Sequence, residues 1–247
     1  MLKLDHKVPD ALVLPEPVVD LKAHLASKGA HWFCALPEYT DQTDTGAVRS
    51  LKSVTDDKVA TRTRANKDNS RLTEGGLSFH EAMQCGFLME GATINPGRWS
   101  VAVRFYASQN AARTLVTLNP ADSENYVFLQ QMSGRMVFKD RQTTLEVTVA
   151  SEASTGPTLV LAGMSEGRLW LCGEEGEVQR SKQGALGLEG LMTLFVGCRN
   201  DKGRLHKTLG AFTLFDLVFW PDLNVLEPGA RETTDALTDH HLWRPAR

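Results

Sequence analysis

A five-residue stretch, Gly163–Gly167, carries the G-x-S-x-G pattern of a nucleophilic serine, with Ser165 at its centre. In that pattern a strand leads into the serine and a helix follows, which exposes the hydroxyl beside backbone N–H donors. Here the residues after the pattern, RLWLC, are typical of a second strand. We therefore interpret the stretch as a hairpin turn and predict no catalytic serine.

Histidines close to acidic residues are the candidates for a metal site. His80 begins a run similar to the helical H-E-x-x-H pattern of zinc proteases, but Gln84 stands where the second histidine must be. In the run Asp239–His241 neighbouring side chains point in different directions, so two of them would share one ion only awkwardly. We predict no cofactor, and calcium stays open because the sequence has no dedicated calcium-loop pattern.

A charged, amide-rich stretch, residues 199–206, is the candidate for ligand binding. Guanidinium, amide and carboxylate groups form the hydrogen bonds that suit sugar hydroxyls and uronates. Loops on a rigid scaffold are also where binding residues concentrate. The predicted ligand-binding residues are Arg199, Asn200, Asp201, Arg204 and His206. The alternative is a solvated hairpin that binds nothing.

A second charged stretch, residues 41–69, contains a basic cluster of Lys58, Arg62, Arg64 and Lys67. Charge runs usually mark solvated faces, so we interpret this stretch as surface loops and an edge strand, VATRTR. An ion site or an anionic-glycan site is the alternative.

Two apolar runs flank the candidate ligand loop and would hold it. The run 194–196 stops at Gly197, and the run 211–220 alternates until Pro221, which cannot donate to a strand ladder. Period-two alternation rich in aromatic residues predicts a strand with one buried face. On this pattern Leu214 and Asp216 share a face.

The rest of the chain from residue 75 has the same character. Trp99–Tyr106 is the cleanest alternating strand, and short strand-like runs separated by Gly, Asn and Pro turns follow it. Many short strands at regular spacing, with no helix of ordinary length between them, indicate a β-sandwich or jelly roll. At the ends we predict a proline-containing arm over 1–16, a short helix over 18–27 and a polar tail after 226.

The motifs resemble a known superfamily in their order. GGLSF at 75–79, WSVAVRFYAS at 99–108 and LFVGCRNDKG followed by LGAFTLFDLVFW after residue 194 resemble the laminin-G-like modules of the concanavalin A-like lectins and glucanases. The resemblance covers residues 75–226 and implies an all-β, two-sheet antiparallel jelly-roll sandwich. We divide the chain into an arm with a short helix (1–30), the sandwich (31–226) and a C-terminal tail (227–247).

The same superfamily contains polysaccharide-cleaving enzymes, which sets a test for catalysis. Its glucanases carry alternating acids, E-x-D-x-x-E, on one strand, and retaining hydrolysis needs two carboxyl groups about 5–5.5 Å apart. The acidic run Glu174–Glu177 lies at a glycine-flanked turn and lacks that spacing. We therefore expect a protein that is not an enzyme.

Composition narrows the possible partners. The net charge of −3 gives no basic excess for neutralising phosphates, so nucleic acid is not an expected partner. No apolar run approaches the ~18 residues that span a bilayer. The four cysteines form no C-x-x-C pair, and the N-terminus lacks the apolar core of a signal peptide, so we expect free thiols and synthesis in the cytoplasm.

The leading functional hypothesis is a non-catalytic adhesion module that recognises cell-surface carbohydrate. Modules of this resemblance occur as fibres or spikes on phage-like particles, where the arm and the tail would contact the particle or an oligomer partner. Two alternatives stay open: a structural component of a virion or oligomer that binds only protein, and a polysaccharide-cleaving enzyme of the same fold.

Overall fold

The computed structural model describes residues 20–73, 75–109, 111–120, 124–151, 155–174, 176–188, 190–203 and 206–243. The predicted arm over 1–16 and the predicted ligand-binding residue Arg204 lie outside these described residues. The predictions about them therefore stay open.

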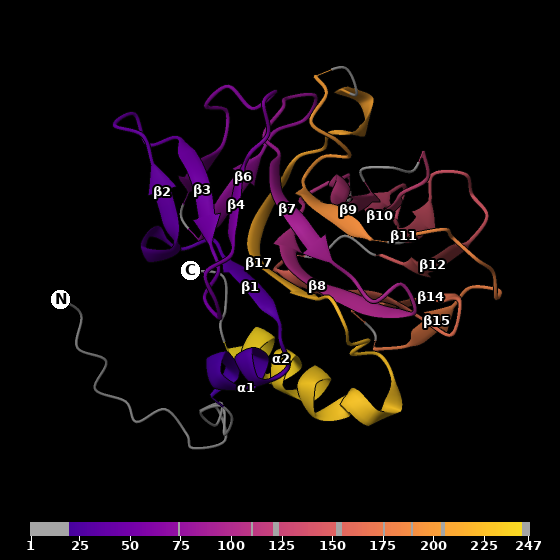
Figure 1. The fold of residues 1–247 in the computed structure, drawn as a ribbon. Helices are drawn as coiled ribbons and strands as arrows, with labels where there is room; N and C mark the ends of the chain where they lie inside the picture. The colour runs from indigo at the N-terminus through magenta and orange to yellow at the C-terminus, as the bar shows by residue number, and fades with distance from the viewer. Residues whose placement is uncertain are drawn as a thin grey trace.

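Antiparallel strands form two sheets (Figure 1). The first sheet has eight strands: β1 (His31–Cys34), β5 (Arg71–Thr73), β6 (Gly76–Phe79), β8 (Arg98–Tyr106), β13 (Thr158–Ser165), β14 (Arg168–Cys172), β15 (Val178–Arg180) and β17 (Phe212–Trp220). The second has nine: β2 (Thr40–Gln42), β3 (Val48–Lys52), β4 (Val59–Arg62), β7 (Phe87–Thr93), β9 (Arg113–Pro120), β10 (Val127–Met132), β11 (Arg135–Asp140), β12 (Glu146–Ala150) and β16 (Leu191–Val196). The helical elements are α1 (Leu21–Ser27), η2 (Pro37–Tyr39), η3 (His206–Thr208), η4 (Pro228–Ala230) and α2 (Arg231–Trp243).

The strand order places sequence-distant strands side by side. It runs β15-β14-β13-β8-β17-β6-β5 in the first sheet, where β1 also pairs with β17, and β12-β11-β10-β9-β16-β7-β4-β3-β2 in the second.

The run over 59–64 was predicted as an edge strand, and this was wrong, because β4 lies between β3 and β7. The charged residue of β4, Arg62, is half-buried and pairs with Asp68.

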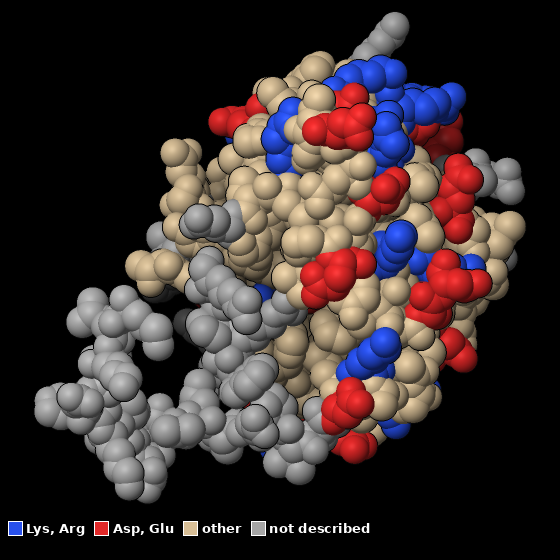
Figure 2. Space-filling model, turned by 90° about the vertical axis from the view of Figure 1, so that its left-hand side faces the viewer, with Lys and Arg blue, Asp and Glu red and all other residues tan. Residues whose placement is uncertain are grey.

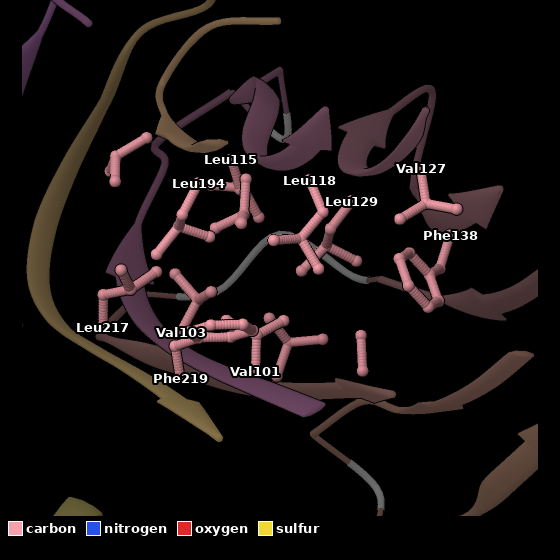
Figure 3. Packing of buried hydrophobic residues seen from close by; sticks show 14 of the residues in the cluster. Val101, Val103, Leu115, Leu118, Val127, Leu129, Phe138, Leu194, Leu217 and Phe219 are labelled. Carbon is pink, nitrogen blue, oxygen red and sulfur yellow. The ribbon is translucent and has the colours of Figure 1, made fainter. Parts of the chain in front are cut away.

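The main core lies between the two sheets, as alternation predicted. Val101 and Val103 of β8 point toward Leu118 of β9 and Leu129 of β10, and all four are buried (Figure 3). The opposite faces of these strands carry the intervening residues, as a two-residue period requires. The predicted two-sheet antiparallel jelly-roll sandwich is confirmed.

Strand β17 confirms a predicted strand but corrects its faces. The pairing of β17 with β8 shifts register between Leu214 and Asp216, which is a β-bulge. The extra residue reverses the alternation, so Leu214 and Leu217 both face the main core while Asp216 faces away from it. The prediction that Leu214 and Asp216 share a face was wrong, and both faces of β17 are buried.

A second core covers the outer face of the first sheet. Figure 1 shows α1 and α2 together below this sheet, and the His24 ring bonds to the Thr233 hydroxyl between the two helices at 3.0 Å. Leu25 and Leu237 pack there against Trp32 and Trp220. The C-terminal segment was predicted as a polar tail, but it forms α2, which packs on the sheet of its own chain. Its predicted contact with a neighbour stays a prediction.

The GMSEG stretch is a hairpin turn, as predicted. Ser165 pairs with Arg168 across the turn, and Glu166 and Gly167 both have positive φ, 52° and 66°, as a two-residue type I′ turn requires. The Ser165 hydroxyl is buried and accepts a hydrogen bond from Asn224.

The four cysteines are buried free thiols. Within the described ranges, no helix has both the length and the apolar character needed to cross a membrane.

Beneath α2 lies a buried group of polar side chains on the outer face of the first sheet. Arg104 pairs with Asp216 at 3.5 Å and donates to Nδ1 of His241 at 3.3 Å. Asp216 also accepts from the indole of Trp32 at 3.0 Å, and the ring of His240 meets that indole edge-on. Burial, the charge of Arg104 and neighbouring His240 lower the pKa of His241, against the opposing effect of Asp216.

We expect stability to fall in acid because of His241. Its folded pKa is below its usual value of about 6.5, so the unfolded chain takes up the proton first. The stabilising contribution is complete above about pH 6.5 and is lost as the pH falls below it. Denaturant titrations at pH 7.5 and 5.5 should show a smaller pH effect in His241→Gln than in the wild type. The control is His206→Gln, which changes an exposed histidine and should show the same pH effect as the wild type. An equal pH effect in His241→Gln and the wild type would contradict the assignment to His241.

Candidate functional site

The loop between β16 and β17 lies across the outer face of the second sheet and is anchored there by Arg199. The Arg199 guanidinium stacks 3.7 Å from the centre of the Phe128 ring. It donates to the Thr114 hydroxyl at 3.1 Å and to the Gln130 amide oxygen at 2.8 Å. Burial lowers the pKa of Arg199. These contacts fix the side chain within the chain, so Arg199 positions the loop.

Asp201 joins this loop to a second one. One carboxylate oxygen accepts from the backbone N–H of Arg64 at 2.5 Å, and the other pairs with the Arg64 guanidinium. The hydrogen bond to Asp201 and the charge of that carboxylate raise the pKa of Arg64. The two residues are 137 positions apart in the sequence, so the fold alone brings them together.

Two further predicted residues are also held by local bonds. The Asn200 amide oxygen accepts from the backbone N–H of Lys202 at 2.8 Å, which shapes the turn. Nδ1 of His206 bonds to the carbonyl of Ala82 at 2.8 Å. The structure therefore gathers Arg199, Asn200, Asp201 and His206 at one end of the sandwich, and their role toward a ligand stays a prediction.

Three residues of the predicted basic cluster, Arg62, Arg64 and Lys67, reach the same end, whereas Lys58 lies before β4, at the opposite end of that strand. We name as the basic loop end the side chains of Arg62, Arg64, Lys67, Lys202 and Lys207. Figure 2 shows Lys and Arg gathered with Asp and Glu at the upper end of the molecule. Arg62 pairs with Asp68, and Arg64 pairs with Asp201. The three lysines are exposed.

Sequence reasoning had considered the basic cluster and the 199–206 loop separately. It missed their association, because no local pattern reports a contact between two loops so far apart. The opposite charges of Arg64 and Asp201 were the only signal, and charged residues are common on surfaces. Within the described residues, no group of three or more His, Cys, Asp or Glu is placed to hold a metal ion, and calcium remains open.

Comparison with known proteins shows the fold. No model of a protein family matches the sequence, and no curated protein sequence matches it. Trypanosoma rangeli sialidase in complex with sialic acid superposes with a TM-score of 0.58 and 12% identity, over 90% of this chain and 37% of that chain. The same sialidase in complex with 2,3-difluoro-KDN gives 0.58 and 11% identity, over 85% and 33%.

A mouse laminin α1 fragment, domains LG4-5, superposes with a TM-score of 0.39 and 11% identity over 61% of this chain and 44% of that chain, a score too low to support a conclusion. This chain spans about a third of the length of the sialidase chains. At such low identity the likeness shows the fold alone. The protein has a two-sheet antiparallel jelly-roll fold, to which α1 and α2 are added.

Proposed function

We propose that this protein is a non-catalytic binding module that recognises anionic carbohydrate through its basic loop end. The observation that carries the proposal is the junction of two distant loops by Arg64 and Asp201. This junction leaves Lys67, Lys202 and Lys207 exposed on adjoining segments. Asp68 and Asp201 neutralise the charges of Arg62 and Arg64. The three lysines therefore supply the cationic hydrogen-bond donors that a ligand would contact.

The chemistry of this surface suits carboxylates on an extended sugar chain. Ammonium groups donate strong, charge-assisted hydrogen bonds to carboxylates, and flexible lysine side chains can follow sugars of differing geometry. Arg199 and Asp201 make their bonds within the chain, so their part is to fix the two loops. Because the lysines are solvent-exposed, binding through them should weaken with added salt.

We expect the wild type to bind a galacturonic acid tetrasaccharide more tightly than a neutral galactose tetrasaccharide. Lys67→Glu and Lys202→Glu should each weaken binding by about tenfold or more, since a charge-assisted hydrogen bond contributes about 1.5–3 kcal/mol. Calorimetric titration at two salt concentrations measures both effects. The matched control is Lys22→Glu, the same charge reversal at an exposed position of α1.

Equal affinity of the wild type and the two loop variants would remove the basic loop end as the site. The same experiment tests the two alternatives from the sequence. New reducing ends in the titrated mixture would favour a polysaccharide-cleaving enzyme. An absence of binding across uronate, sulfated and neutral oligosaccharides would favour a structural component that binds only protein.

A further inference from the structure

A cleft of about 550 Å³ opens between α2 and the strands β13, β14 and β15. Its floor is aliphatic: Leu159 and Leu161 come from the outer face of β13, Val178 from β15, and Val225 and Leu226 from the segment before η4. Leu161, Val225 and Leu226 belong to the second core. The cleft therefore continues this core to the surface, and its volume is typical of small-molecule sites.

The rim of the cleft is charged, and most of its charges are paired. Glu227 pairs with Arg98 at 2.7 Å. On α2, Arg231 and Asp235 approach each other at 3.7 Å. These two pairs cancel, so they leave the rim without net charge of their own.

Glu174 is a charged residue of the rim that belongs to neither ion pair. Its carboxylate accepts from the Thr158 hydroxyl at 2.9 Å, and no ion pair joins it to a basic side chain of the described residues. A hydroxyl leaves the negative charge of the carboxylate in place. Among the described residues that line the cleft, Glu174 therefore supplies an unbalanced negative charge beside an aliphatic floor.

From this geometry we infer a binding site for a primary aliphatic amine, with its alkyl chain on the floor and its ammonium group at Glu174. An anionic head group would meet the Glu174 carboxylate, and a neutral one would leave that charge unpaired. The described residues that line the cleft include no Phe, Tyr or Trp. Quaternary ammonium groups are commonly held by aromatic cages, so a primary ammonium, which donates hydrogen bonds to a carboxylate, fits better. This site is separate from the basic loop end.

Calorimetric titration with hexylamine and octylamine at pH 7, below their micelle concentrations, tests the inference. Each added methylene buried on the floor should tighten binding by about fourfold. Glu174→Gln, which keeps an acceptor for Thr158, should weaken octylamine binding by about tenfold, because a hydrogen bond to a charged group is replaced by a neutral one. Glu232→Gln, elsewhere on α2, is the control and should bind like the wild type.

A second variant tests the position of the site. Thr238 on α2 lines the cleft and is exposed, so the Thr238→Trp side chain can fill the cleft without entering the core. This variant should abolish binding while its melting temperature stays near that of the wild type. If this variant does not fold, Val178→Trp fills the cleft from the edge strand β15. Octanoate binding as tight as octylamine, an unchanged affinity in the filled variant, or no octylamine binding by the wild type would each overturn the inference.

Discussion

Asp216→Asn should lower the free energy of unfolding by about 3 kcal/mol or more, because it removes the carboxylate charge that pairs with the buried Arg104 guanidinium. The side chains of Arg104 and Asp216 are only 4% and 7% exposed, so water cannot replace the lost carboxylate. Asparagine retains an oxygen that can accept from the Trp32 indole, which isolates the effect of charge. Denaturant unfolding at pH 7.5 measures the change.

Two controls identify the cause. Asp235→Asn removes the same charge from an exposed ion pair with Arg231 on α2 and should change stability by less than about 1 kcal/mol. The double variant Arg104→Met with Asp216→Asn contains no uncompensated charge of this pair and should recover much of the loss. The single variant Arg104→Met completes the cycle, and a loss in the double variant equal to the sum of the Asp216→Asn and Arg104→Met losses would show that the two side chains are not coupled.

Gly197→Ala should cost about 3 kcal/mol or more, or prevent folding. Gly197 has φ +70°, and a Cβ at this position would lie 2.0 Å from Cε1 of Phe79. Phe79 cannot easily move away, because its ring stacks on Phe212 with centroids 4.3 Å apart. The variant therefore combines a left-handed backbone cost of about 1–2 kcal/mol with overpacking of about 1–3 kcal/mol.

Gly29→Ala provides the matched control. Gly29 follows α1 with a similar φ of +67°, and a Cβ at this position would have no atom of the described residues within 4 Å. Only the backbone cost of about 1–2 kcal/mol applies, so the difference between the two variants measures the clash with Phe79. Thermal and denaturant unfolding of the pair should separate them clearly. Similar losses in both would show that the Phe79 ring moves aside at little cost.

Local patterns in the sequence were sufficient for the fold class. The alternation in Trp99–Tyr106 predicted β8 and its core face, and RLWLC predicted β14 with the bounds that the structure has. Turn residues between the strands, such as Glu166 and Gly167, marked the hairpins. Strand periodicity and turn chemistry are properties of neighbouring residues, so a single sequence carries them.

The sequence did not predict the features that depend on which strands become neighbours. The bulge in β17 arises in its pairing with β8 and decides that Asp216 meets Arg104 and Trp32. Three further features also depend on the topology: the packing of α2 on the first sheet, the cleft beside that helix, and the contact of Asp201 with Arg64, 137 positions away in the sequence. Local patterns of residues predicted an all-β sandwich with a charged loop. The contacts of that loop depend on long-range packing, because contacts between distant residues have no local periodicity.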